Sequence, residues 1–158
     1  RYLATLPVVP RDGTLLRNQD DGTIVVVAGG AKFDFNSPEE LEAAITSVRR
    51  MFPTRRLTAI FQPHLYTRTR DLYEEFAAAL SHADEAILVP IYPARELPIE
   101  GVTSEIIADR VSVPCTICER ENLAAYLGEH QTDVVVTFGA GNIDAYCEDI
   151  ATTLRKKA

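Results

Sequence analysis

The residue types best suited to chemistry lie close together in the stretch FQPHLYTRTRD, residues 61–71. It contains His64, Thr67, Arg68 and Arg70. Arginine guanidinium groups beside an imidazole can hold a carboxylate or a phosphate through paired hydrogen bonds. The alternative is a polar loop with solvated arginines, in which a threonine caps the helix that follows. The residue types alone leave both interpretations open.

A glycine-rich turn, Gly139-Ala140-Gly141-Asn142, is the second candidate. Its two glycines would let the backbone approach a ligand, and the free N–H groups of the following helix can bind an anion. The turn lacks the third glycine of a dinucleotide fingerprint, so a simple strand-to-helix turn is the alternative. We expect the turn to lie at the same edge of the sheet as His64.

A third candidate is the loop formed by residues 92–103, which is long for a connection between a strand and a helix. Long ordered loops are often functional. Glu96 and Glu100 in this loop could contact a ligand or a metal ion, or they could be solvated carboxylates.

Cys115 and Cys118 are predicted to be packing residues rather than metal ligands. Residues three apart in a strand point to opposite faces, so this pair cannot converge on one metal ion. The sequence also lacks a GxxxxGK[ST] phosphate loop. We therefore expect no metal site in this chain and no ATP hydrolysis by the chain alone.

Apolar strands and amphipathic helices must position these residues. Pro63 ends the strand before His64, so the His64 segment follows the carboxyl end of that strand, where open α/β sheets bind ligands. Ser37 and Pro38 predict the start of a helix. The predicted strands are residues 14–17, 23–28, 57–61, 86–92, about 115–118 and 134–138, and the predicted helices are residues 37–52, 70–82, 104–111, about 122–129 and a segment ending near 154. This alternation predicts an α/β, Rossmann-like three-layer domain with a mostly parallel sheet and a short N-terminal hairpin.

Composition narrows the classes of partner. The net charge is −7 over 158 residues, which disfavours nucleic acid, because phosphate backbones are bound by clustered Lys and Arg. No apolar run approaches the roughly 18 residues that span a bilayer. Three cysteines and no signal peptide at the start predict a reducing, cytoplasmic location.

Three motifs together, FQPHLYTRTRD, YPARE and GAGNI, resemble the C-terminal domain of the Mur ligases, and among them the UDP-N-acetylmuramate:L-alanine ligases. The likeness runs from about Ser37 to the end of the chain. It implies the amino-acid side of an ATP-dependent ligase of peptidoglycan synthesis, in which the muramoyl carboxylate is phosphorylated and then attacked by the amine of L-alanine. The implied substrate-binding residues are His64, Thr67, Arg68, Gly139, Gly141 and Asn142, with Arg68 pairing with the L-alanine carboxylate. No catalytic residue is implied in this chain.

The resemblance also implies that some substrates and cofactors are bound by other domains of the enzyme. ATP, Mg²⁺ and UDP-N-acetylmuramate would be bound with the help of N-terminal and central domains, so the chain alone would be inactive. Residues 1–30 would be a hairpin segment, with a faint likeness to a central domain, and residues 31–158 the C-terminal-like domain. The alternative function is a non-catalytic binding domain or an engineered scaffold with a small anion site.

Besides the N-terminal and central domains, which this sequence lacks, two local features depart from the family pattern. The family carries Asp-Asp-Tyr-Ala-His-His-Pro before the helix that Ser37 caps, whereas residues 32–38 of this chain read KFDFNSP. At position 65, where many relatives have arginine, this chain has leucine. The acidic and histidine groups of the family motif are therefore missing, and one arginine contact is absent.

Overall fold

The computed structural model describes residues 13–17, 24–28, 37–139 and 142–156. Gly141 and the departing motif at residues 32–36 lie outside the described residues. The predictions made for them stay predictions.

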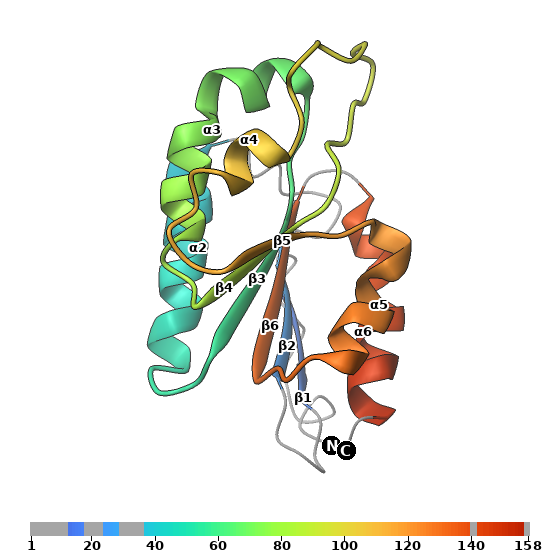
Figure 1. Ribbon diagram of the computed structural model, residues 1–158. Helices are drawn as coiled ribbons and strands as arrows, with labels where there is room; N and C mark the ends of the chain where they lie inside the picture. The colour runs from blue at the N-terminus through green and yellow to red at the C-terminus, as the bar shows by residue number, and fades with distance from the viewer. Residues whose placement is uncertain (1–12, 18–23, 29–36, 140–141, 157–158) are drawn as a thin grey trace.

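A single six-stranded sheet forms the centre of the molecule, with strand order β1-β2-β6-β3-β4-β5 (Figure 1). Its strands are β1 (Gly13–Arg17), β2 (Ile24–Ala28), β3 (Leu57–Gln62), β4 (Glu85–Leu88), β5 (Cys115–Ile117) and β6 (Val134–Gly139). β1 is antiparallel to β2, and every other neighbouring pair is parallel. The predicted α/β class, parallel sheet and N-terminal hairpin are confirmed. The division at residue 30 stays a prediction; β2, on its N-terminal side, lies between β1 and β6 in the same sheet.

Helices cover both faces of the sheet and complete the three layers. Figure 1 shows α2 (Pro38–Met51), α3 (Tyr66–Leu80) and α4 (Glu105–Ala108) on one face, and α5 (Leu123–Glu129) and α6 (Cys147–Lys156) on the other. Short 3₁₀ turns, η1 (Arg120–Asn122) and η2 (Ile143–Tyr146), precede α5 and α6. Each face has its own apolar core, because successive strand residues point to opposite faces. Phe61 packs with the α2–α3 side, whereas Ile60 packs with the α5–α6 side.

The start of α2 follows the predicted capping pattern. Ser37 Oγ accepts a hydrogen bond of 3.1 Å from the Glu40 N–H, and Pro38 occupies the first helical turn. A proline is tolerated there because its missing N–H would have had no partner within the helix.

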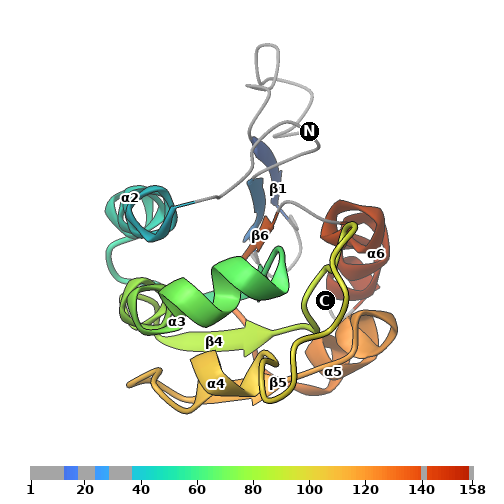
Figure 2. The same ribbon diagram turned by 90° about the horizontal axis from the view of Figure 1, so that it is seen from above.

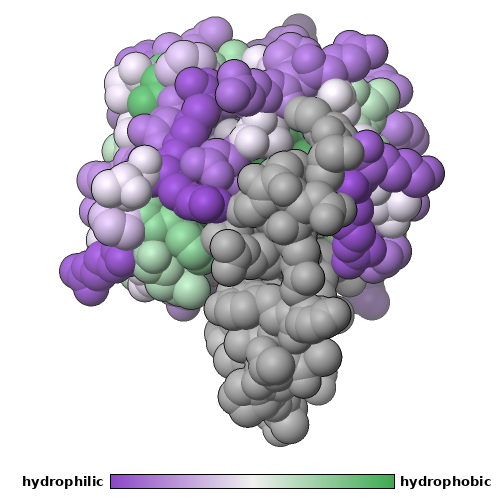
Figure 3. Space-filling model, turned by 90° about the horizontal axis from the view of Figure 1, so that it is seen from below, coloured by the Kyte–Doolittle hydropathy of each residue, from purple (hydrophilic) through white to green (hydrophobic). Residues whose placement is uncertain are grey.

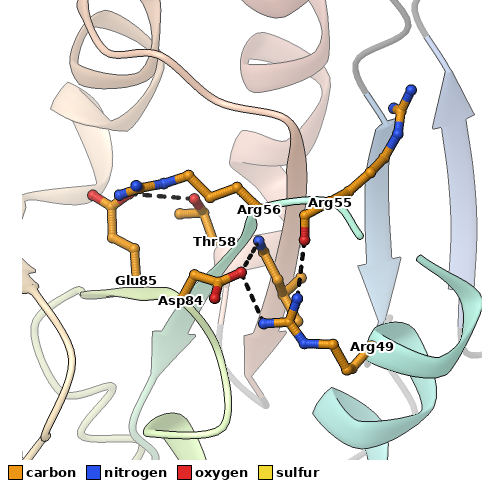
Figure 4. Close-up of polar contacts among 7 residues, drawn as sticks. Arg49, Arg55, Arg56, Thr58, Asp84 and Glu85 are labelled. Atoms are coloured by element: carbon orange, nitrogen blue, oxygen red, sulfur yellow. Dashed lines mark hydrogen bonds and ion pairs between the residues drawn. The ribbon is translucent and has the colours of Figure 1, made fainter. Parts of the chain in front are cut away.

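Polar contacts at the amino ends of β3 and β4 join α2 to the sheet (Figure 4). Asp84 accepts hydrogen bonds from the Leu57 N–H at 2.7 Å and from Arg49 at 2.8 Å. Burial disfavours the charged form of Asp84, but these donors outweigh it and lower the pKa of its carboxyl group. Arg56 pairs with Glu85 at 3.1 Å beside them.

The surface seen from that end is mostly hydrophilic around the atoms drawn in grey (Figure 3). The three arginines of this region, Arg49, Arg55 and Arg56, are each paired with a carboxylate of Asp84, Asp133 or Glu85. Their charges are therefore balanced locally.

Several predicted boundaries were wrong. Helix α3 begins at Tyr66 instead of residue 70, so Thr67 and Arg68 lie in its first turn and not in a loop. Strand β4 ends at Leu88 instead of Tyr92, although Tyr92 forms an isolated parallel bridge with His64 further on. Helix α4 spans only four residues, and the last helix is divided into η2 and α6.

The predicted packing role of the two cysteines agrees with their positions. Cys115 packs against the α2–α3 core, and Cys118 belongs to the α5–α6 core. Burial raises the pKa of the Cys115 thiol to about 11, so it stays a neutral, apolar group at ordinary pH.

Candidate functional site

The candidate site lies at the carboxyl edge of the sheet, where β3 leads into α3. Leu65 connects the two with a φ of 69°, a left-handed conformation that is unfavourable for a branched side chain. Its N–H donates to the Tyr92 carbonyl at 2.9 Å, and its own carbonyl accepts from Thr69 Oγ1 at 2.8 Å. Leu65 makes no side-chain cap bond, so no threonine caps this helix as the loop interpretation had expected.

His64 and Arg68 are brought together by this geometry. Arg68 Nη1 lies 3.3 Å from His64 Nδ1, and both side chains are partly exposed. The His64 ring stacks on the Tyr92 ring, with centroids 5.8 Å apart and planes inclined by 14°. Since the pair stands at the start of a 15-residue helix, the helix dipole adds positive potential there.

Arg70 does not join this pair. Residues that are two positions apart on a helix are rotated by about 200° about its axis. The side chains of Arg68 and Arg70 therefore point to different sides of α3. Arg70 Nε instead pairs with Asp71 at 2.7 Å. The pairing of two arginines around one anion, considered from the sequence, is therefore not formed.

Thr67 is held from a distant part of the chain. Glu96, in the loop after β4, accepts hydrogen bonds from the Thr67 N–H at 3.0 Å and from the Thr67 hydroxyl. These two bonds are the main cause that lowers the pKa of the Glu96 carboxyl group. Glu96, noted in the sequence as a possible ligand contact, is thus engaged with the start of α3.

The glycine turn begins directly beside the end of β3. Gly139 pairs with Gln62 in the parallel register of β6 and β3, which confirms that the turn and His64 share one edge. A Cβ on Gly139 would lie 2.9 Å from Gln62 Cβ and 3.0 Å from Ile143 Cγ2. Glycine is therefore required here by close packing; contact of Gly139 with a ligand stays a prediction.

Gln62 and Arg120 were missed from the sequence. Gln62 is fully buried, donates to Asn142 Oδ1 at 3.0 Å and accepts from the Ile143 N–H at 3.0 Å. Arg120 also donates to Asn142 Oδ1, at 3.2 Å. A polar residue at the end of an apolar strand was the one available signal for Gln62. Arg120 carried no such signal, because its partner is 22 residues away.

A pocket of about 250 Å³ opens nearby, beyond the ends of β4 and β5. It is lined mainly by apolar groups, including Ile91, Val102 and Ile117, and it shares Tyr66 with the start of α3. In the described part of the chain, no group of three or more His, Cys, Asp or Glu side chains is placed to hold a metal ion. Nor does any described helix have the length and apolar character to cross a bilayer.

A family model described as the Mur ligase glutamate ligase domain matches residues 14–141. The chain belongs to the Mur ligase family. The resemblance inferred from the three motifs is therefore confirmed, and the match begins within the N-terminal hairpin.

Two curated relatives with the same name are about half identical to this Mur ligase domain. Over 122 residues, 76% of the chain, it is 48% identical to the UDP-N-acetylmuramate--L-alanine ligase of Phocaeicola vulgatus. It is 50% identical over 121 residues to the enzyme of that name in Parabacteroides distasonis. The chain spans 27% and 26% of the length of these two relatives.

The fold of a solved Mur ligase agrees. The UDP-N-acetylmuramate-alanine ligase MurC of Thermotoga maritima superposes with a TM-score of 0.71 over 95% of this chain and 31% of its own. The identity is 18%, so this likeness supports the fold.

Proposed function

We propose that the chain is the amino-acid-side domain of a ligase that joins L-alanine to UDP-N-acetylmuramate in peptidoglycan synthesis. The observation that carries the proposal is the His64–Arg68 pair at the carboxyl edge of β3, in a chain about half identical to ligases with that name. A non-catalytic scaffold is not favoured, because no observation on the site supports it over the ligase.

The side chains support binding of a small amino acid. Arg68 offers a guanidinium for the L-alanine carboxylate, since arginine binds carboxylates through charge-assisted hydrogen bonds. His64 adjoins the same guanidinium and fixes its direction. Thr67, Gly139, Gly141 and Asn142 are proposed to border the bound amino acid.

The reaction itself needs groups outside this chain. Transfer of the γ-phosphoryl group of ATP to the muramoyl carboxylate gives an acyl phosphate. The alanine amine then attacks the acyl carbon, so that a C–N bond forms and phosphate leaves. We assign ATP, Mg²⁺ and UDP-N-acetylmuramate to the other domains. Among the described residues, no cluster of three or more His, Cys, Asp or Glu side chains is placed to hold a metal ion, and the sequence has no GxxxxGK[ST] phosphate loop. The ATP and nucleotide-sugar substrates support a cytoplasmic location.

The test uses a fusion in which this chain replaces the matching segment of the Phocaeicola vulgatus relative. Phosphate release and product mass are measured with ATP, Mg²⁺, UDP-N-acetylmuramate and either L-alanine or D-alanine. We expect turnover that requires L-alanine, and none from the chain alone. A folded fusion that turns over no L-alanine, while the unmodified relative does, would contradict the proposal.

A further inference from the structure

The segment that leads into α3 is hydrogen-bonded to the loop after β4 at several points. The Tyr92 N–H donates to the Pro63 carbonyl at 2.8 Å, and the Leu65 N–H donates to the Tyr92 carbonyl at 2.9 Å. These bonds extend the pairing of β3 and β4 beyond the sheet. Figures 1 and 2 show the loop rising at this edge, between the start of α3 and the α5–α6 pair.

Glu96 completes this attachment at the first turn of α3. Both of its carboxylate oxygens are used, one by the Thr67 N–H and the other by the Thr67 hydroxyl. The first N–H groups of a helix have no partner within it, and Leu65, at the capping position, makes no side-chain cap bond. A carboxylate 29 residues away in sequence thus does the work of the missing cap.

The held residue is next to the one proposed to bind substrate. Thr67 immediately precedes Arg68, and both belong to the same helical turn. A backbone fixed at Thr67 fixes the point from which the Arg68 side chain leaves the helix. Leu65, which precedes this turn, has an unfavourable φ. Such a φ persists only when neighbouring contacts enforce it, so the contacts with the loop after β4 are needed here.

We propose that Glu96 is a positioning residue: its bonds to Thr67 orient Arg68 for the carboxylate of the amino-acid substrate. The proposal rests on the proposed function for the identity of the substrate. Glu96 itself does not touch the amino acid. Its negative charge is satisfied by the start of α3 and by nearby Arg70.

The kinetic test uses the fusion enzyme with E96A, E96Q and, as a matched control, E75A. Glu75 is an exposed carboxylate on the same helix. We expect E96A to raise the KM for L-alanine about 10-fold, because small displacements of a binding group weaken binding strongly. The KM for UDP-N-acetylmuramate should change less than about 2-fold. E96Q keeps an acceptor for the Thr67 N–H, so its KM for L-alanine should lie close to that of the unmodified fusion. The KM of E75A should equal that of the unmodified fusion.

A second measurement, on the 158-residue chain, does not depend on activity. Amide hydrogen exchange at Thr67 should become at least about 10-fold faster in E96A than in E75A, because a lost hydrogen bond lowers local protection. An unchanged exchange rate at Thr67 in E96A would overturn the hydrogen bond between Glu96 and Thr67, whatever the kinetics of the fusion enzyme show. Faster exchange with an unchanged KM for L-alanine would overturn the positioning role. An inactive unmodified fusion would instead count against the proposed function, and the exchange result would still decide the attachment.

Discussion

Arg68 Nη1 lies 3.3 Å from His64 Nδ1, across the junction between β3 and α3. Arginine has donors only, so a hydrogen bond across this contact requires His64 Nδ1 as the acceptor, with the ring proton on Nε2. The contact between His64 and Arg68 therefore predicts one tautomer of the His64 ring.

This tautomer is a first prediction. The ¹⁵N chemical shifts of the imidazole rings, measured near pH 8, should show His64 in the Nε2–H form. His130 is an internal control, because its Nδ1 lies 2.7 Å from the Tyr126 carbonyl, which can only accept. His130 should show the Nδ1–H form. The Nδ1–H form at His64 would contradict the contact with Arg68.

Gln62 is predicted to hold the glycine turn in place. Gln62→Leu keeps the approximate volume but leaves the buried Ile143 N–H without its acceptor. We expect a loss of roughly 2–3 kcal/mol in the free energy of unfolding, measured by urea denaturation. Gln131 is exposed, and Gln131→Leu should change stability by less than about 0.5 kcal/mol. Equal stabilities for the two variants would argue against this role.

Gly139→Ala should destabilise the same edge. The added Cβ would lie 2.9 Å from Gln62 Cβ and 3.2 Å from the Gln62 carbonyl oxygen, part of the rigid backbone. We expect a loss of roughly 1–3 kcal/mol, as for overpacking in a core. At Gly128 the nearest atom is the Thr153 methyl group at 3.1 Å, which can move. Gly128→Ala should therefore lose less unfolding free energy than Gly139→Ala. A larger loss in Gly128→Ala would contradict the close packing assigned to Gly139.

Asp84 should make stability depend on acid pH. Its folded-state pKa is lowered, so it contributes stability above the unfolded value of about 3.9. That contribution is lost as the pH falls through the folded-state pKa. Asp84→Asn should destabilise the chain by about 1 kcal/mol at pH 7 and by less near pH 3. Stability is measured by thermal unfolding, with Asp109→Asn, at an exposed position, as the control. A loss of stability in Asp84→Asn that is larger at pH 3 than at pH 7 would refute the role of Asp84.

The sheet and the shared edge were predictable because they depend on local patterns. Apolar strands that alternate with helices impose parallel crossovers, which bring the ends of β3 and β6 together at Gln62 and Gly139. Ser37 likewise signals its helix through residues within one turn.

The remaining features depend on long-range contacts. The start of α3 was misplaced because a strained leucine precedes it and its cap comes from Glu96, 29 residues away. The Gln62–Asn142 bond joins residues 80 apart, so no local pattern reveals it. The separation of Arg68 from Arg70 follows only once both are placed on a helix.

The KM for L-alanine in the fusion enzyme carrying Arg68→Ala, compared with Arg70→Ala, shows whether Arg68 binds the carboxylate of the substrate. A lost charge-assisted bond to a carboxylate corresponds to about 10- to 100-fold weaker binding. We predict an increase of that size for Arg68→Ala and less than about 3-fold for Arg70→Ala, with both variants folded. An unchanged KM for L-alanine in Arg68→Ala would show that Arg68 does not bind the substrate carboxylate.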